Sequence, residues 1–303
     1  MTETPRTHFV AWGPDQAGKL ASLWAVASPG ELLSIAELDR VVFADSGIVL
    51  ASPDASGAVV AVTRESQGAI RGYVKLIVVH PDARRHALGR RLLAAAEAWM
   101  AAHGATTAGF GGGVPLYLWP GVDVVNLPTC SLAQSAGYRV TGCAVNLRIS
   151  TGYRSAMPPR VSMLRFGGGN DHDRKRLSAL RALVTAEWPA WLTEFDLGAL
   201  HGALFGAFTD DAEGGTIPLG FFAHSTLRTG WIGPLGTHPR YRQRGVGAAL
   251  LSAVCADLQR IGFTHAEIAW VGPLSYFADK GAVHSRAFRQ FSKTLSPVLS
   301  PPA

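Results

Sequence analysis

The segment Arg242-Gln243-Arg244-Gly245-Val246-Gly247 decides how this sequence is interpreted. It lies between an apolar run at residues 230–235 and a stretch of helical character at residues 248–261. Its two glycines leave no Cβ atoms over the loop, so successive backbone N–H groups can approach an anion, and the following helix adds the positive end of its dipole. Arg242 and Arg244 add positive charge. These are the features of a pyrophosphate cradle, although glycine-rich turns also occur for conformational reasons alone.

The pattern around this segment occurs twice in the chain. Ten residues recur at a constant separation of 158 positions, for example His80 and His238 (238 − 80 = 158). The first-half members are His80, Pro81, Arg84, Gly89, Leu92, Leu93, Ala95, Gly104, Thr106 and Ala108, and their partners are His238, Pro239, Arg242, Gly247, Leu250, Leu251, Ala253, Gly262, Thr264 and Ala266. Because they keep one register over a strand, a loop, a helix and the next strand, they indicate a duplicated domain.

Composition and length favour two ordinary globular domains. Of 303 residues, 48% are hydrophobic and 17% charged, which is enough for two cores of about 150 residues each. The three cysteines, Cys130, Cys143 and Cys255, lack the spacing of a zinc site or a disulfide framework. The N-terminus lacks the order of a signal peptide, and no uncharged apolar run approaches the ~20 residues that span a bilayer. We therefore expect a cytoplasmic protein with no membrane partner and no metal.

The formal net charge of +6 favours an anionic partner. The densest arginine runs, at residues 84–91 and 240–244, coincide with the two copies of the cradle. They do not form a basic stripe with interleaved aromatic residues. The sequence therefore favours a small anionic ligand over nucleic acid.

Hydrophobic periodicity and breaker residues predict a similar succession of elements in both halves. For the first half we expect helices at 15–27 and 29–43, strands near 47–50, 58–64 and 69–79, a helix at 85–103, a strand at 107–110, a short helix ending at Gly137 and a strand at 143–149. For the second half we expect a strand at 161–166, helices at 171–187 and 191–206, strands at 216–225 and 229–237, a helix at 243–261 and a strand at 264–270.

Residues 242–247 resemble the motif Arg/Gln-x-x-Gly-x-Gly/Ala of the GNAT superfamily, whose members are acyl-CoA-dependent N-acyltransferases. The stretches at 231–242 and 266–277 look like the second half of bacterial tandem-GNAT proteins. The resemblance covers nearly the whole chain and is strongest between residues 229 and 292. In the first half, Ala87 stands where the motif has its first glycine, which places a methyl group against the expected phosphate path.

The resemblance implies an α/β (α+β) protein of two tandem GNAT domains, each a mixed, mainly antiparallel sheet flanked by helices. Residues 1–150 would form an N-terminal domain with a degenerate cofactor motif, 151–160 a linker, 161–295 a C-terminal domain with the acetyl-CoA site, and 296–303 a flexible tail. A monomer and a homodimer are both compatible with it. The acetyl-CoA-binding residues it implies are Leu235, Gly236, Thr237, Arg242, Gln243, Arg244, Gly245, Val246, Gly247 and Ala248.

The mechanism that the resemblance implies is direct attack of an uncharged amine on the thioester in a ternary complex. The departing thiolate then needs a proton from a positioned acid such as tyrosine. The family commonly has a Phe-Tyr pair on the short helix after the fifth strand, whereas this chain has Tyr276-Phe277 in reversed order. Tyr276 is the candidate acid, and the alternative is that it packs against the sheet. The first half has Leu132-Ala133 there, with no hydroxyl.

An amine of pKa near 10 also needs a route for its proton. Glu267 on the fifth strand is the candidate base, although strand alternation could equally direct it to solvent. Glu194 and Asp196 either recognise a cationic amine or lie on a solvated helix face, and His224 is either a base or a structural strand histidine. Trp188 and Trp191 supply aromatic area for an acceptor pocket or for the core.

We therefore expect an N-acetyltransferase that moves acetyl from acetyl-CoA to a primary amine of a small molecule. The alternative is a non-catalytic protein that binds CoA or a small molecule as a sensor or sequestering agent, which Ala87 and the order Tyr276-Phe277 make credible. The sequence leaves open which amine is acetylated, whether a longer acyl group is used and whether the first half binds CoA.

Overall fold

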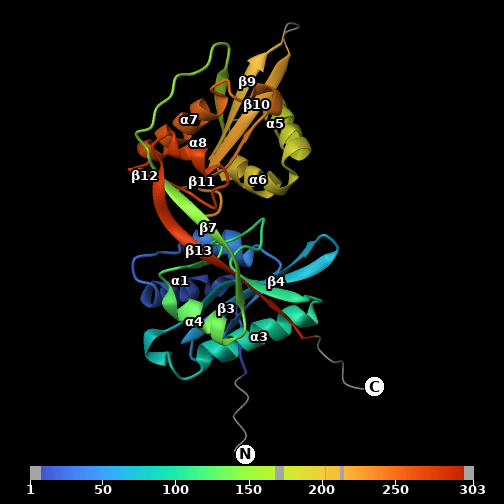
Figure 1. Ribbon diagram of the computed structural model, residues 1–303, viewed down its shortest axis with the longest axis vertical. Helices are drawn as coiled ribbons and strands as arrows, with labels where there is room; N and C mark the ends of the chain where they lie inside the picture. The colour runs from blue at the N-terminus through green and yellow to red at the C-terminus, as the bar shows by residue number, and fades with distance from the viewer. Residues whose placement is uncertain (1–7, 168–173, 202, 212–214, 297–303) are drawn as a thin grey trace, which may run out of the picture. The chain divides into compact units, whose positions relative to one another are not determined.

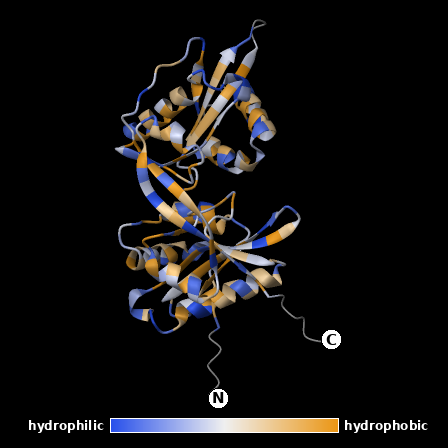
Figure 2. Ribbon diagram, in the orientation of Figure 1, coloured by the Kyte–Doolittle hydropathy of each residue, from blue (hydrophilic) through white to orange (hydrophobic). Residues whose placement is uncertain are grey.

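The computed structural model describes residues 8–167, 174–201, 203–211 and 215–296 (Figure 1). The chain forms two compact units. Unit 1 contains the described parts of Met1–Ala144 and Ala287–Ala303, and unit 2 contains those of Val145–Arg286. Hydrophobic residues concentrate on the central strands of each unit, and the outward faces of the helices are more hydrophilic (Figure 2). Both units therefore have a core of their own.

Unit 1 is built on a sheet that is antiparallel except where β4 and β5 run parallel. Its strands, in spatial order, are β1 (Val10–Ala11), β2 (Gly47–Ala51), β3 (Gly57–Ser66), β4 (Ala69–Val79), β5 (Thr107–Phe110) and β13 (Val283–Thr294). The helices are α1 (Ala17–Ala27), α2 (Ile35–Leu38), α3 (Leu88–Ala102) and α4 (Leu127–Ser135). Leu92 and Ala96 of α3 pack against Val59 and Val74 of the sheet.

Unit 2 repeats this plan, again with one parallel pair, between β11 and β12. Its strands, in spatial order, are β8 (Ser162–Phe166), β9 (Leu204–Asp210), β10 (Thr216–His224), β11 (Trp231–Thr237), β12 (His265–Ile268) and β7 (Arg139–Ser150). The helices are α5 (Arg174–Glu187), α6 (Leu192–His201), α7 (Val246–Arg260) and α8 (Leu274–Ala278). The predicted α/β class with mainly antiparallel sheets is confirmed.

Alternation along β10 divides unit 2 into two apolar layers. Phe221 and Ala223 pack with Leu180 of α5 and Phe195 of α6. Phe222, one residue along, packs instead with the residues of α7. Successive side chains of a strand point to opposite faces, so α5 and α6 cover one face of this sheet and α7 covers the other.

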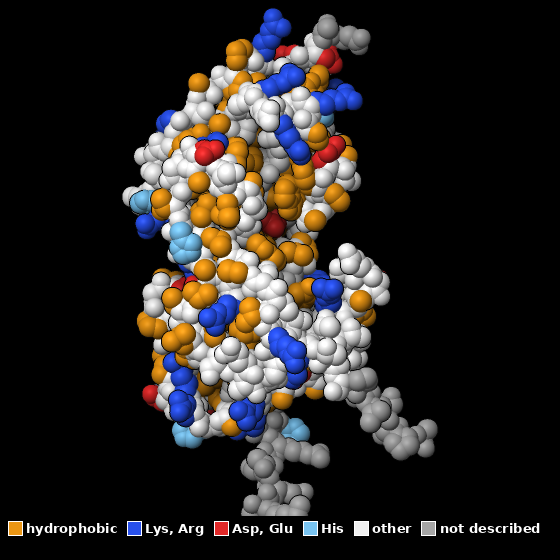
Figure 3. Space-filling model, viewed as in Figure 1, with side chains coloured by type: hydrophobic (Ala, Val, Ile, Leu, Met, Phe, Trp, Pro, Cys, Tyr) orange, Lys and Arg blue, Asp and Glu red, His pale blue; other side chains and the backbone are white. Residues whose placement is uncertain are grey.

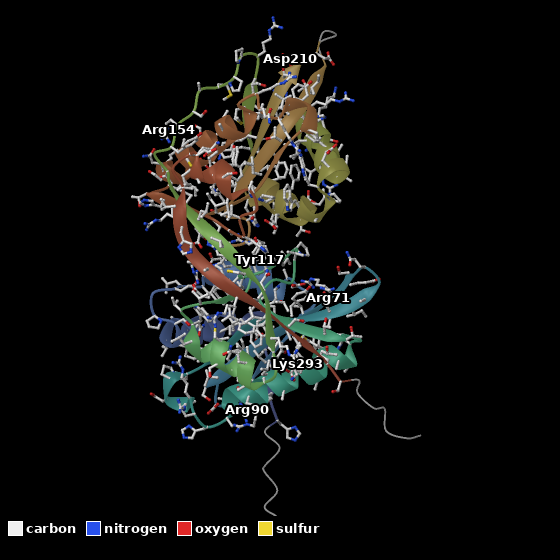
Figure 4. The ribbon with its side chains drawn as sticks, in the orientation of Figure 1. Arg71, Arg90, Tyr117, Arg154, Asp210 and Lys293 are labelled. Atoms are coloured by element: carbon white, nitrogen blue, oxygen red, sulfur yellow. The ribbon has the colours of Figure 1, made fainter. Side chains whose placement is uncertain are left out.

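The last strand of each repeat completes the sheet of the other unit. Strand β7 follows the helix α4 of the first repeat, yet its end pairs with β12, from Leu147↔Ile268 to Ser150↔His265. Strand β13 follows α8 of the second repeat, yet its end pairs with β5 of unit 1. Within unit 1, Lys293 of β13 also forms an ion pair with Glu97 of α3 at 2.8 Å (Figure 4). The sequence boundary at residue 150 therefore marks the end of a repeat, while the compact units divide inside β7 and β13.

Two predicted helices differ from the structure. The helix expected at 191–206 is wrong at its end, because α6 stops at His201 and Leu204–Asp210 is strand β9. Residues 204–208 are buried as a continuous run, a pattern that periodicity does not distinguish from a buried helix. The helix expected at 29–43 begins only at Ile35, where the Ser34 hydroxyl accepts a hydrogen bond from the Glu37 N–H. The tail expected at 296–303 lies outside the described residues except for Ser296.

Candidate functional site

The strand β11 of unit 2 has an open edge. It pairs with β12 only at Trp231↔Glu267 and Ile232↔Ile268, whereas β10 pairs with it as far as Thr237. Beyond Ile232 the side that faced β12 has no strand partner among the described residues. Leu235, Gly236 and Thr237 lie in this stretch. Unpaired backbone groups along a strand edge can pair with an extended ligand.

The loop at 242–247 follows this open edge and leads into α7. Gln243 and Gly245 have φ angles of +61° and +81°, and α7 begins at Val246. Val246 is buried in the core, while residues 242–245 are exposed. The Arg242 Nε donates to the Thr237 carbonyl at 3.4 Å. The loop is therefore anchored at both ends, and its backbone is presented to solvent at the start of a 15-residue helix.

Two hydroxyl groups meet over the first turn of α7. A methyl group placed on Gly247 would lie 2.7 Å from the Tyr276 Oη and 3.3 Å from the Thr237 Oγ1. Both hydroxyls thus converge on Gly247, the cradle glycine next to Ala248. Only a glycine leaves this space open.

Helix α8 directs its two aromatic residues in different directions. Phe277 is buried in the core, and the Tyr276 hydroxyl is directed to the cradle. The Tyr276 Oη is buried without a hydrogen-bond partner among the described residues. Burial raises the pKa of Tyr276, which keeps the phenol protonated. The order Tyr276-Phe277 therefore still brings a hydroxyl to the cradle.

Unit 1 has the same backbone but different side chains at the equivalent place. Arg85 and Ala87 have φ angles of +69° and +58°, so the loop keeps its conformation although Ala87 replaces a glycine. A methyl group on Gly89 would meet the Leu132 Cδ2 at 3.5 Å and the Val79 Cγ2 at 3.6 Å. Hydrocarbon therefore replaces both of the hydroxyls found in unit 2.

The loop after β5 fills the interior of unit 1. Tyr117, Leu118 and Trp119 are all buried, and Figure 4 labels Tyr117. The Trp119 ring stacks on Trp24 of α1 with ring centroids 4.8 Å apart, and its Nε1 donates to the Glu31 Oε1 at 2.8 Å. This loop therefore packs Trp119 within its own unit.

An aromatic cluster lies beside the open edge of unit 2. The Trp188 and Trp191 rings stack with centroids 5.8 Å apart, and Trp188 lies 5.8 Å from Phe221. A methyl group on Gly236 would be 2.7 Å from the Trp188 Cζ3, so Trp188 lies directly on β11. Both tryptophans remain partly exposed. The structure thus brings the predicted acceptor aromatics to the strand predicted to bind acetyl-CoA.

Glu194 and Asp196 behave differently although they share α6. Glu194 is buried, with 8% exposure, and burial raises its pKa to about 8. Asp196 is exposed and forms a two-oxygen ion pair with Arg181, each contact being 2.8 Å. The predicted solvated helix face therefore describes the position of Asp196 but not that of Glu194.

Glu267 lies on the face of the sheet opposite to Ala266 and Ile268, which pack in the α7 layer. It is half-buried, and its Oε1 accepts a 2.5 Å hydrogen bond from the Asn146 Nδ2. Asn146 is fully buried, and its Oδ1 accepts from the Trp270 N–H at 2.8 Å. Asn146, a polar residue in an apolar strand, was not predicted from the sequence, because the exchange of β7 that brings it here has no local sequence signal.

The structure does not bring His224 to the aromatic cluster. Its side chain lies on the α7 face, where the Nε2 is 3.0 Å from the Asp257 Oδ2 and the Nδ1 is 3.1 Å from the Ser225 Oγ. Burial lowers the pKa of His224. Asp257 also binds Arg165 and Arg260, at 3.1 and 3.0 Å. Of the two roles considered for His224, these contacts are those of a structural strand histidine, because strand alternation places the side chain in a polar network on the α7 face of the sheet.

Within the part of the chain that the structure describes, no group of three or more His, Cys, Asp or Glu side chains is arranged to hold a metal ion. None of the helices within it combines the length and the apolar character needed to cross a membrane.

Comparisons with known proteins agree with the geometry. The family described as "Acetyltransferase (GNAT) family" matches residues 22–112 and 177–275. No curated protein matches the sequence. Among solved structures, a tandem GNAT protein from the clavulanic acid biosynthesis pathway is 18% identical, with a TM-score of 0.70 over 96% of this chain and 99% of that one.

Two other solved structures share the fold. A GCN5-related N-acetyltransferase from Sphaerobacter thermophilus is 19% identical, with a TM-score of 0.61 over 98% of both chains. The glucosamine N-acetyltransferase region of a fungal multi-domain GH3 beta-N-acetylglucosaminidase is 16% identical, with a TM-score of 0.72 over 96% of this chain. This chain spans 38% of that fungal protein. At these identities the likeness concerns the fold.

Proposed function

The chain belongs to the acetyltransferase (GNAT) family, and on that premise we propose that unit 2 transfers acetyl from acetyl-CoA to a primary amine of a small molecule. The observation that carries the proposal is the convergence of the Tyr276 and Thr237 hydroxyls on Gly247. A proton donor, the first turn of α7 and the open edge of β11 all meet there. Acetyl-CoA would supply the thioester.

The residues present fit the phosphates and the arm of this donor. The exposed backbone of residues 242–245 and the first turn of α7, including Gly247 and Ala248, would bind the pyrophosphate. Arg242 and Arg244 would add charge, and the Arg244 guanidinium is held 5.4 Å from the Tyr241 ring centroid. Residues 235–237 would pair with the extended arm through their backbone.

Proton transfer is the chemical task of the side chains. The amine nitrogen bonds to the acetyl carbon, the carbon–sulfur bond breaks, one amine proton ends on sulfur, and the additional proton of the original ammonium is released to solvent. Tyr276, a protonated phenol whose hydroxyl has no hydrogen-bond partner among the described residues, would give the proton to sulfur. Glu267, held by Asn146 on the face opposite α7, is the carboxylate that we propose takes a proton from the amine.

We propose that unit 1 is not catalytic. Its cradle backbone is retained, but Val79 and Leu132 leave no proton donor near Gly89. A polar transition state would therefore face hydrocarbon there.

Calorimetry with acetyl-CoA tests the donor site. Gly247→Glu puts a carboxylate in the proposed phosphate path, and Gly89→Glu is the matched substitution in unit 1. We expect wild type and Gly89→Glu to bind one acetyl-CoA per chain and Gly247→Glu to bind none, with thermal melting confirming that each variant folds. If Gly89→Glu lost binding and Gly247→Glu kept it, the donor site would lie in unit 1 and not in unit 2. If wild type did not bind acetyl-CoA, the proposal would be wrong.

A further inference from the structure

Glu194 is a buried carboxyl group with no cationic partner among the described residues. Its residue is 8% exposed, and burial alone raises its pKa, with no hydrogen bond or charged group of the described structure contributing. Asp257 in the same unit is equally buried, and its carboxylate contacts His224, Arg165 and Arg260. Buried carboxyl groups are normally satisfied in this second way. The isolation of Glu194 therefore needs a reason.

The position of Glu194 on α6 directs it to the sheet. Gly198, one turn later on the same helix face, packs so closely that a methyl group on it would lie 3.2 Å from the Ala223 Cβ of β10. Trp191 lies one turn earlier, immediately before α6 begins. The next residue, Phe195, packs on Phe221 with ring centroids 5.5 Å apart. The carboxyl group therefore lies on the sheet side of α6, next to the tryptophan cluster.

The surroundings of Glu194 are aromatic and connect with the donor site. Trp188 and Trp191 form a stacked pair with an interplanar angle of 23°. Trp188 covers Gly236 of the open edge, and Phe221 lies opposite Gly236 in the strand register. Figure 3 shows hydrophobic side chains gathered on the part of the surface formed by unit 2. A ligand held here would be adjacent to the strand proposed to bind the donor.

The chemistry of such a place favours a cation. Ionisation of a buried carboxyl group without a partner carries an unrecovered desolvation cost, which an opposite charge within hydrogen-bond distance offsets. The faces of tryptophan rings also attract ammonium groups. An anionic ligand would meet the carboxyl group without a compensating cation from the described residues. The site therefore selects by charge as well as by shape.

We propose that Glu194, walled by Trp188 and Trp191, binds the protonated amino group of the acceptor, so that unit 2 accepts cationic amines with an aromatic or apolar body. The assignment of this ligand as the acceptor rests on the proposed acetyltransferase function. The binding itself does not require acetyl-CoA, so the two can fail separately.

The test is calorimetric binding of 2-phenylethylamine, with 2-phenylethanol as the neutral counterpart of the same shape. We expect wild type to bind the amine at least tenfold more tightly than the alcohol. Glu194→Gln should weaken amine binding at least tenfold and remove the preference. Asp196→Asn, on the same helix but on the surface, should behave as wild type. The 13C resonance of the Glu194 carboxyl, identified by its absence in Glu194→Gln, should shift on addition of the amine only.

Equal amine binding by wild type and Glu194→Gln would overturn the proposal, as would a wild type that fails to bind 2-phenylethylamine or that prefers the alcohol. Melting curves show whether Glu194→Gln folds, and the carboxyl resonance of wild type gives the answer without any variant. Acetyl-CoA binding by the same proteins distinguishes the proposed amine site from the proposed acetyltransferase function. If the protein binds acetyl-CoA but not the amine, only the amine site at Glu194 is wrong. If it binds the amine but not acetyl-CoA, only the acetyltransferase function is wrong.

Discussion

Replacing Glu194 with glutamine should change how the stability of unit 2 depends on pH. The carboxyl group has its pKa raised by burial from 4.5 to about 8. Below pH 4.5 both the folded and the unfolded chain hold the proton, so the group costs nothing. Between pH 4.5 and 8 only the unfolded chain releases it, so the free energy of unfolding falls as the pH rises. Above pH 8 both states are ionised, and the loss is complete.

The size of this loss follows from the pKa values. A rise from 4.5 to about 8 corresponds to about 5 kcal/mol at ~1.36 kcal/mol per pH unit. Water entry or small movements of α6 would lower the figure, so it is an upper limit. The glutamine side chain is neutral at every pH, so the variant shows none of this pH-dependent loss. Any difference in packing between glutamine and glutamic acid changes the free energy of unfolding by the same amount at every pH. The variant should therefore gain stability relative to wild type as the pH rises.

Urea unfolding at several values between pH 4 and 9.5 measures this difference, with Asp196→Asn as the control. Hydrogen exchange of the amides in α6 and β10 assigns the change to unit 2. Saturating 2-phenylethylamine should reduce the pH dependence of wild type and leave that of Glu194→Gln unchanged. A stability difference between Glu194→Gln and wild type that stays constant from pH 5 to 9 would refute a strongly raised pKa and the isolation of the carboxyl group.

Further predictions concern the neighbouring groups. Tyr276→Phe should lower kcat on the order of 10²- to 10⁴-fold with little change in acetyl-CoA binding, as steady-state kinetics and calorimetry would show; unchanged kcat would exclude it as the acid. Gly236→Ala places a methyl group 2.7 Å from the Trp188 Cζ3 and should cost ~1–3 kcal/mol in thermal or urea unfolding, which an unaltered midpoint would contradict. Asp257→Asn weakens the network around His224 and should destabilise unit 2 by ~1–3 kcal/mol, with KM for both substrates unchanged; a raised KM would place His224 in the site after all.

Local sequence signals located the loop at 242–247 but did not settle burial on the acceptor side. The glycines at 245 and 247 permit the backbone that this loop adopts, although the helix expected from residue 243 begins only at Val246. Glu194 and Asp196 differ by two positions on α6, and nothing local distinguishes a buried acid from an ion-paired surface acid. His224 could lie on either face of β10, and the register of the whole sheet decides which one. The burial of a side chain, and the face of the strand or helix on which it lies, depend on tertiary packing, which the sequence pattern constrains but does not determine.

The exchange of β7 and β13 gives a physical reason why a non-catalytic first repeat would be retained. Strand β7 belongs to the first repeat, but it pairs with β12, and its Asn146 donates the hydrogen bond that holds Glu267. Without β7 the strand β12 would become a sheet edge, and the half-buried carboxylate of Glu267 would lose its partner. The hydrocarbon side chains of Val79 and Leu132, which stand where unit 2 has hydroxyls, leave this contribution untouched. Selection on unit 2 alone would therefore preserve the fold of both repeats while permitting the chemistry of the first to disappear.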